Sequence, residues 1–131
     1  MDFLVHHRCY DPNVPLILWQ IAVIGEMGYR TDRPYSRSGL EVLVDVLQEE
    51  YSADHDVVVY EAAQIPVCDP VMTHVPLAKL PDAPVTGIST LYLPPAGKTA
   101  VDRSMLERLG ISRDKPEQVA KAAVKVGQAA T

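Results

Sequence analysis

The chain has 131 residues, of which 47% are hydrophobic and 22% are charged, and this composition indicates one globular domain. Seventeen acidic residues against twelve basic ones give a net charge of -5. General binding to nucleic acid or to an anionic membrane is therefore not expected, because it requires clustered Lys and Arg. The longest apolar stretch, 14–24, is too short to span a bilayer, and no signal-peptide pattern opens the chain. Two cysteines make no disulfide framework, so a reduced, cytoplasmic setting is expected.

The first predicted strand covers residues 16–24, where nearly every side chain is apolar, between Pro15 and Gly25. A continuous apolar run of this length predicts a strand that is covered on both faces. Gln20 interrupts the run, and an amide in such a strand needs hydrogen-bond partners. Residues 26–37, with several charged groups, a glycine and a proline, indicate an exposed loop.

A helix is predicted from Ser38 to Tyr51. Ser38 precedes Glu41 by three residues, which is a capping-box pattern. Apolar side chains then recur at helical spacing, at Leu40, Leu43, Val44, Leu47 and Tyr51. Residues 52–56 are the expected turn, and residues 57–63 form the second predicted strand.

Three prolines limit the structure between residues 64 and 80, so we expect only a short edge strand at 71–75 and a one-turn helix at 77–80. Residues 87–93 form a third strand, which two prolines end. Asp102 is placed to cap a short helix that stops at Gly110. A last helix, near residue 116, is either an interface helix or a frayed tail.

These elements predict the fold class α/β (α+β-like), a single domain with a mixed β-sheet flanked by helices. The predicted boundaries are 1–110 for the domain and 111–131 for a helical tail or interface segment.

Three patterns suggest chemistry but have simpler explanations. Gly97-Lys98-Thr99 lacks the earlier glycine of a phosphate loop, since Tyr92 stands there. The histidines and cysteines lack the spacing of metal ligands, so no metal site is predicted, and surface histidines and buried thiols explain them (His6, His7, His55, His74, Cys9 and Cys68). The cluster 54–56 lies at a turn, where short polar residues are expected.

Small and polar groups at the strand ends are better candidates for a binding site. Ser89 and Thr90 are hydroxyls in an apolar strand, and each either bonds to local backbone or faces a ligand. Ala62 and Ala63, at the end of the second strand, are small enough for a flat ring to approach the backbone. Ligands in open α/β sheets bind outside the carboxyl ends of the strands.

Seven segments in this order carry a resemblance to a known family, at residues 2–5, 16–20, 42–51, 56–63, 69–71, 87–95 and 105–109. Together they resemble the C-terminal half of the tetrapyrrole methylase-like methyltransferases that use S-adenosylmethionine. The resemblance is closest to the peptide-backbone N-methyltransferases of borosin biosynthesis, and it covers roughly residues 2–110.

This resemblance implies an enzyme of two α/β domains that works as a homodimer and holds its cofactor, S-adenosylmethionine, in the cleft between the domains. The part matched here would bind the adenine end and carry no catalytic residue. The cofactor-binding residues that the resemblance implies are Gln20, Ala62, Ala63, Gln64, Ile88, Ser89 and Thr90.

The family's N-terminal half, with its Gly-rich loop, has no counterpart in this sequence. We therefore expect a cofactor-side domain whose catalytic half is missing, with a possible peptide as the substrate of the complete enzyme. The alternative is a non-catalytic dimerisation or peptide-binding module of the same fold. Because the loss of a partner domain exposes an apolar face, self-association is also predicted.

Overall fold

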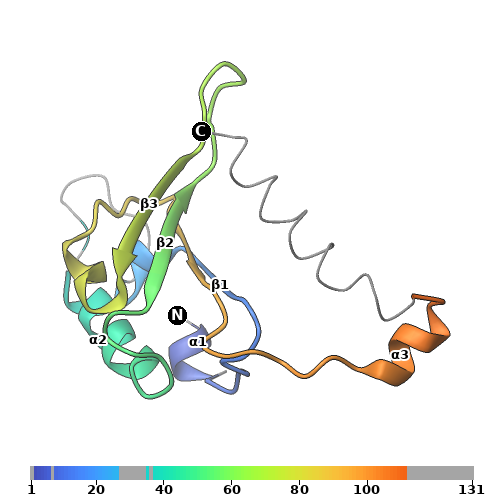
Figure 1. The fold of residues 1–131 in the computed structure, drawn as a ribbon. Helices are drawn as coiled ribbons and strands as arrows, with labels where there is room; N and C mark the ends of the chain where they lie inside the picture. Colours follow the sequence, from blue (N-terminus) through green and yellow to red (C-terminus); the bar gives the residue numbers. More distant parts are fainter. Residues whose placement is uncertain (1, 7, 27–34, 36, 112–131) are drawn as a thin grey trace. The chain divides into compact units, whose positions relative to one another are not determined.

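The computed structural model describes residues 2–6, 8–26, 35 and 37–111 (Figure 1). The chain divides into two compact units, Met1–Thr99 and Ala100–Thr131. The first unit contains a sheet and several short helices, and the second contains α3 (Arg103–Arg108). The elements of the first unit are α1 (Asp2–Val5), β1 (Leu16–Trp19), the 3₁₀ helix η1 (Ile21–Val23), α2 (Arg37–Leu47), β2 (Asp56–Glu61), β3 (Val71–Pro76), the 3₁₀ helix η2 (Leu77–Asp82) and β4 (Thr90–Leu93).

The four strands form one sheet in the order β1-β4-β2-β3, so the predicted fold class, a small α/β (α+β-like) domain, is confirmed. Each of the three strand pairings is antiparallel, although the sequence suggested a mixed sheet. The physical reason is the position of β4. The helical crossover through α2 does bring β1 and β2 into the same direction, but β4 lies between them and runs opposite to both.

One face of the sheet forms the hydrophobic core with α2 and η2, which lie on the same side of the sheet in Figure 1. The predicted apolar stripe of the helix is confirmed, because all five of its residues are buried. Leu43 and Leu47 of α2 pack in the same core as Val57, Leu91 and Leu93 of the sheet, and all five are fully buried. The helix itself is shorter than predicted and already includes Ser38, so Ser38 does not stand before it as a cap.

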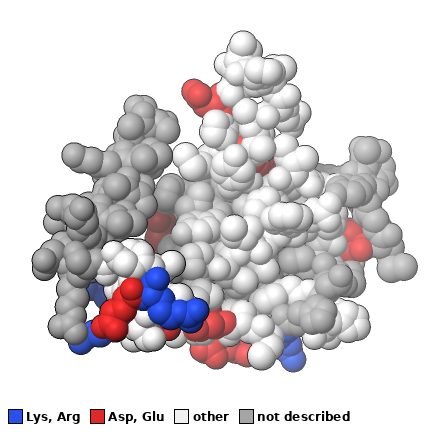
Figure 2. Space-filling model, turned by 90° about the vertical axis from the view of Figure 1, so that its right-hand side faces the viewer, with Lys and Arg blue, Asp and Glu red and all other residues white. Residues whose placement is uncertain are grey.

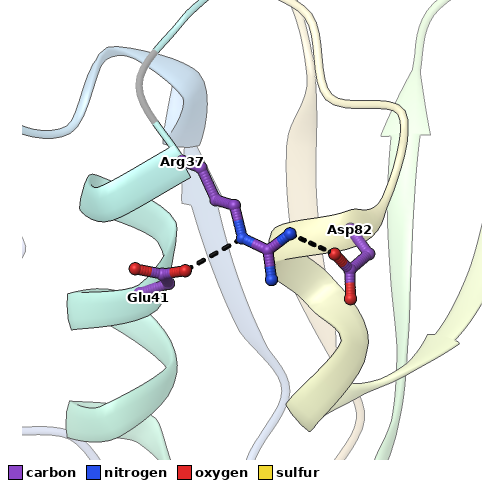
Figure 3. Close-up of polar contacts among 3 residues, drawn as sticks. All are labelled: Arg37, Glu41 and Asp82. Carbon is purple, nitrogen blue, oxygen red and sulfur yellow. Dashed lines mark hydrogen bonds and ion pairs between the residues drawn. The ribbon is translucent and has the colours of Figure 1, made fainter.

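Arg37, at the start of α2, connects this helix to η2 (Figure 3). Its Nε donates to the carboxylate of Glu41 at 2.9 Å, and its Nη1 donates to the carboxylate of Asp82. The bond to Glu41, followed by the charge of Asp82, raises the pKa of Arg37. All three side chains are more than half exposed, so water screens the charges and the contact adds little to stability.

The first strand differs most from its prediction. It ends at Trp19, because Gln20 adopts a left-handed conformation with φ 54° and begins η1. The strand is also not covered on both faces, since Ile17 is 57% exposed and Trp19 is 79% exposed. As the edge strand of an antiparallel sheet, β1 only partly buries alternate residues, Leu16 and Leu18, and a continuous apolar run does not reveal this.

The shorter elements follow the sequence more closely. The edge strand β3 and the helical turn η2 lie where they were predicted. The second strand, β2, ends at Glu61, so Ala62 and Ala63, which were predicted as its end, lie in the loop that follows. The third predicted strand is shorter, because β4 begins at Thr90 and residues 87–89 form a turn before it.

In the second unit the carboxylate of Asp102 accepts a hydrogen bond from the backbone N–H of Met105 at 3.0 Å, which confirms the predicted cap of α3. Gly110 follows this helix with φ 67°, as the predicted stop requires. The helix predicted near residue 116 and most of the loop 26–37 lie outside the described residues.

Two further findings concern the surface. Within the described ranges, no helix is long and apolar enough to cross a bilayer. Cys9 and Cys68 are free and exposed, so the prediction of buried thiols is wrong. Both lie in segments outside helices and strands.

Candidate functional site

Three strand ends meet at one end of the sheet. Thr90, the first residue of β4, pairs with Trp19 at the end of β1 and with Tyr60 near the end of β2. This follows from the antiparallel direction of β4, whose start must lie beside the ends of both neighbours. Gln20 and Ala62 directly follow these two strand ends, so the predicted residues from three separate segments converge here.

A hydrogen-bond network closes this end of the sheet. Oε1 of Glu61, the last residue of β2, accepts hydrogen bonds from the hydroxyls of Ser89 and Thr86, each at 2.6 Å. The hydroxyl oxygen of Ser89 in turn accepts from the backbone N–H of Thr86 at 2.8 Å, and the N–H of Ser89 donates to the carbonyl of Thr86 at 3.1 Å. The network therefore fastens the turn before β4 to the end of β2.

The same bonds determine the charge of Glu61. The hydroxyl of Ser89, followed by that of Thr86, lowers the pKa of this carboxyl, because both donors stabilise the ionised form more than the neutral form. Glu61 is therefore a carboxylate at neutral pH.

The predicted residues at the start of β4 have different environments. Ser89 is fully buried, and its hydroxyl donates to Glu61 and accepts from the backbone N–H of Thr86. Of the two predicted alternatives, the hydroxyl therefore bonds to local backbone and does not face solvent. Thr90 is half-buried, in register with Trp19. Ile88 is half exposed, so its side chain offers apolar surface beside the turn.

The remaining predicted residues are exposed. Gln20 is exposed but is not without an interaction partner. Ala62, Ala63 and Gln64 begin the loop between β2 and β3, which extends beyond the sheet in Figure 1. Strand register brings Gln20, Ala62 and Thr90 to the same end of the sheet, whereas Ala63 and Gln64 lie further out along the loop.

Glu61 and Thr86 are the residues of this site that sequence reasoning missed. Glu61 closes an apolar strand, and Thr86 lies in a Pro- and Gly-containing loop, so neither stands out by pattern. They are 25 residues apart, and only the pairing of β2 with β4 brings them together.

In the cluster 54–56, Asp54 and His55 lie in the turn before β2, as predicted, whereas Asp56 is already the first residue of β2. Each of the three side chains has a different partner. Nε2 of His55 lies 2.8 Å from the carbonyl oxygen of Pro94, and Asp56 contacts Nδ1 of His74 at 2.8 Å. A hydrogen bond from Ser52 lowers the pKa of Asp54. Among the described residues, no three His, Cys, Asp or Glu side chains are grouped to hold a metal ion.

The outer face of the sheet, opposite α2, is a second candidate surface. Because side chains alternate along a strand, the residues between the buried positions point outward. Strand register sets them in two rows across the sheet, Ile17–Tyr92–Val58–His74 and Trp19–Thr90–Tyr60–Met72. These two rows contain no Lys, Arg, Asp or Glu, although Asp56 at the start of β2 lies on the same face and contacts His74. Figure 2 shows a face of the molecule whose middle carries few charged side chains.

Two hollows lie among α1, η1 and α2, and the smaller one also borders β1 at Ile17, Leu18 and Trp19. One has a volume of about 200 Å³ and includes Trp19 and Leu43 in its lining, and the other has a volume of about 350 Å³ and includes Val5 and Val42. Both are lined mainly by aliphatic and aromatic side chains. They offer contact surface and no titratable group for catalysis.

Several known proteins are similar to this chain in sequence. Over 108 residues the chain is 40% identical to a methyltransferase and ribosomally synthesized cyclic peptide gymnopeptides precursor of Gymnopus fusipes, a match of 79% of this chain and 25% of that protein. It is 33% identical over 112 residues to the corresponding omphalotin A precursor of Omphalotus olearius (82% and 27%). It is 31% identical over 123 residues to a type I borosin cyclic peptide precursor of Serendipita vermifera (90% and 29%).

These similarities relate the chain to proteins that combine a methyltransferase with a borosin-type peptide precursor. The chain spans about a quarter of the length of these relatives. No protein-family model matches the sequence.

Proposed function

We propose that this chain forms the adenine side of an S-adenosylmethionine site in a methyltransferase of the borosin kind. The observation that supports this best is the convergence of β1, β2 and β4, which places Gln20, Ala62 and Thr90 at one end of the sheet. The similarity to methyltransferase–precursor proteins supports the chemical class that we propose, and the convergence of the strand ends supports the location that we propose for the site.

The residues present fit an adenine ring by their chemistry. Purines bind through flat apolar contact and a few hydrogen bonds, often to backbone groups. Ile88 exposes apolar surface, and the exposed backbone at 62–64 is flanked only by small alanine side chains before Gln64. Ser89 would take part indirectly, by shaping the turn beside Ile88, because it is fully buried and its hydroxyl is already engaged by Glu61.

When bound, the cofactor supplies the methyl group as part of a sulfonium. The role that we propose for this chain is to bind and orient the adenosine end, with no acid, base or nucleophile among its residues. Such positioning accelerates transfer by holding donor and acceptor in line. The acceptor that we propose for the complete enzyme is a peptide, and residues 1–110 are the part of the chain that we assign to cofactor binding.

The test is an NMR titration of the isotope-labelled chain with S-adenosylhomocysteine, the product form of the cofactor. We expect amide shifts at residues 62–64 and 88–90, together with a shift of the side-chain amide of Gln20. Adenosine alone should shift the same amides, because the proposed contacts are to the adenine end.

Two results would contradict the proposal. One is the absence of shifts up to the solubility limit of the ligand. The other is a set of shifts confined to the hollow that Val5 and Val42 line, because this would place the ligand away from the strand ends.

A second candidate function is an interaction module, and the outer face of the sheet favours it. Trp19 and Met72 are more than half exposed in a row of residues that carries no charged side chain, and contiguous apolar surface of this kind marks protein contacts. The partner that we propose is a second copy of the chain, as a homodimer. The oligomeric state in solution discriminates this function from that of a monomeric binding domain.

A further inference from the structure

We propose that Glu61 is a positioning residue that holds the segment 86–90 against the end of β2, so that the adenine side of the site exists before the cofactor arrives. This inference rests on the proposed function, since it assigns a role within that same site. Glu61 itself need not touch the ligand, because it acts through the turn that leads into β4.

The geometry of the carboxylate supports this role. One oxygen of Glu61 accepts two hydroxyl bonds of 2.6 Å, from residues 25 and 28 positions further along the chain. Bonds of this length to an ionised acceptor are stronger than bonds between neutral groups. The backbone pairing of β2 with β4 reaches only as far as Thr90. The two hydrogen bonds to Glu61 therefore hold the turn before β4, which the strand pairing does not include.

Because Ser89 is buried, its hydrogen bond to Glu61 favours one conformation of the turn. Ser89 is fully buried, and its hydroxyl would lose its acceptor if the turn moved away from Glu61. A buried hydroxyl without a partner is unfavourable, so the turn is restrained in the position that exposes Ile88 and sets Thr90 beside Trp19.

The experiment compares Glu61→Gln with the wild-type chain and with Asp56→Asn. The control is matched, because Asp56 opens the strand that Glu61 closes, and Asp56 is likewise a carboxylate that contacts one side chain across the sheet. Both changes remove one negative charge. Two quantities are measured for each chain, the hydrogen-exchange rates of the amides of Thr86 and Ser89, and the affinity for S-adenosylhomocysteine in the titration described above.

We expect Glu61→Gln to accelerate exchange of these two amides by about tenfold and to weaken ligand binding by about tenfold, the loss that follows when a charged acceptor becomes neutral. Asp56→Asn should change neither quantity. If Glu61→Gln exchanges as slowly as the wild type, or binds the ligand equally well, the positioning role is wrong while the proposed function stands.

Failure of the wild-type chain to bind would have a different meaning. It would contradict the proposed function, and with it a role of Glu61 in cofactor binding, whatever the exchange rates show. A uniform rise in exchange throughout the sheet of the Glu61→Gln chain would also overturn the inference, because the residue would then support the whole fold. Glu61→Asp, which keeps the charge but shortens the side chain, should give the same local loss as Glu61→Gln.

Discussion

At the scale of single residues, two backbone positions and one carboxylate shape the molecule. Gln20 ends β1 in a left-handed conformation, which residues with a Cβ adopt at a cost in free energy. Gly39 lies where α2 passes close to the chain at Ile24. Glu61 joins the end of β2 to the turn before β4. Each of the three gives a direct test of the physical argument.

The conformation of Gln20 can be tested with two substitutions that both remove its amide. Gln20→Gly should be more stable than Gln20→Ala by about 1 kcal/mol, because glycine has no Cβ to oppose a positive φ. Chemical unfolding of both variants measures this difference. Equal stabilities would mean that Gln20 does not hold this conformation in solution.

Gly39→Ala should destabilise the protein, although alanine normally favours a helix over glycine. A Cβ at this position would lie 2.9 Å from the carbonyl carbon of Ile24, and closer still to the carbonyl oxygen, so the backbone must shift. We expect a loss of about 1–3 kcal/mol in the free energy of unfolding. A gain in stability in thermal and chemical unfolding would show that α2 and residue 24 are further apart.

Glu61 should make stability depend on pH in a defined direction. Its pKa in the folded state is below the ordinary value of 4.5, so the folded state binds its proton less readily than the unfolded state. The stabilisation is therefore fully present above pH 4.5 and is lost as the pH falls through the lower, folded pKa. Unfolding free energies measured across this range should show a smaller acid loss for Glu61→Gln than for the wild type, and identical pH profiles would contradict the lowered pKa.

At the scale of elements, periodicity predicted those segments that have one apolar face. The stripe of α2 was placed by its helical spacing, β2 by its β-branched residues and β3 by the prolines around it, and Asp102 and Gly110 marked the ends of α3. The first strand was predicted too long because its apolar run continues through η1, whose Ile21 and Ala22 are buried by the core and not by strand pairing. Local composition does not distinguish these two kinds of burial.

Helix α2 provides a matched pair of neighbouring residues with opposite environments. Leu43 is fully buried, whereas Val42 is 53% exposed. Leu43→Ala should therefore lower the free energy of unfolding by about 2–5 kcal/mol, because it leaves a cavity in the core. Val42→Ala should change it by no more than about 0.5 kcal/mol, as for other surface positions. Similar losses for both variants would contradict the packing of α2 described here.

At the scale of the whole molecule, the sheet of the first unit has one face in the core and one face that is apolar but exposed. The buried face follows from the alternation of Val57 and Val59 with their less buried neighbours. The outer face joins residues from all four strands, including Ile17, Trp19 and Met72, and it became visible only once the strand order was known. Such a face is costly to leave in water, so we expect it to be covered by a partner.

Self-association through this face is the prediction at this scale. The apparent mass in sedimentation should rise with protein concentration, and Met72→Lys should reduce the association because it places a charge in the outer face. Val67→Lys is the matched control, since Val67 is also apolar and exposed but lies in the loop between β2 and β3. A wild-type chain that stays monomeric at high concentration would contradict the homodimer proposal.

The sequence by itself determined the local features of this protein: the amphipathic helix, the β-branched strands, the cap at Asp102 and the resemblance to methyltransferases. These depend on contacts between residues close in the chain or on patterns along it. The tertiary structure alone decided that β4 lies between β1 and β2, and therefore that Gln20, Ala62 and Thr90 share one end of the sheet. It also revealed Glu61 as the partner of Ser89 and Thr86, because hydrogen bonds between residues 25 and 28 positions apart exist only once the strands have paired.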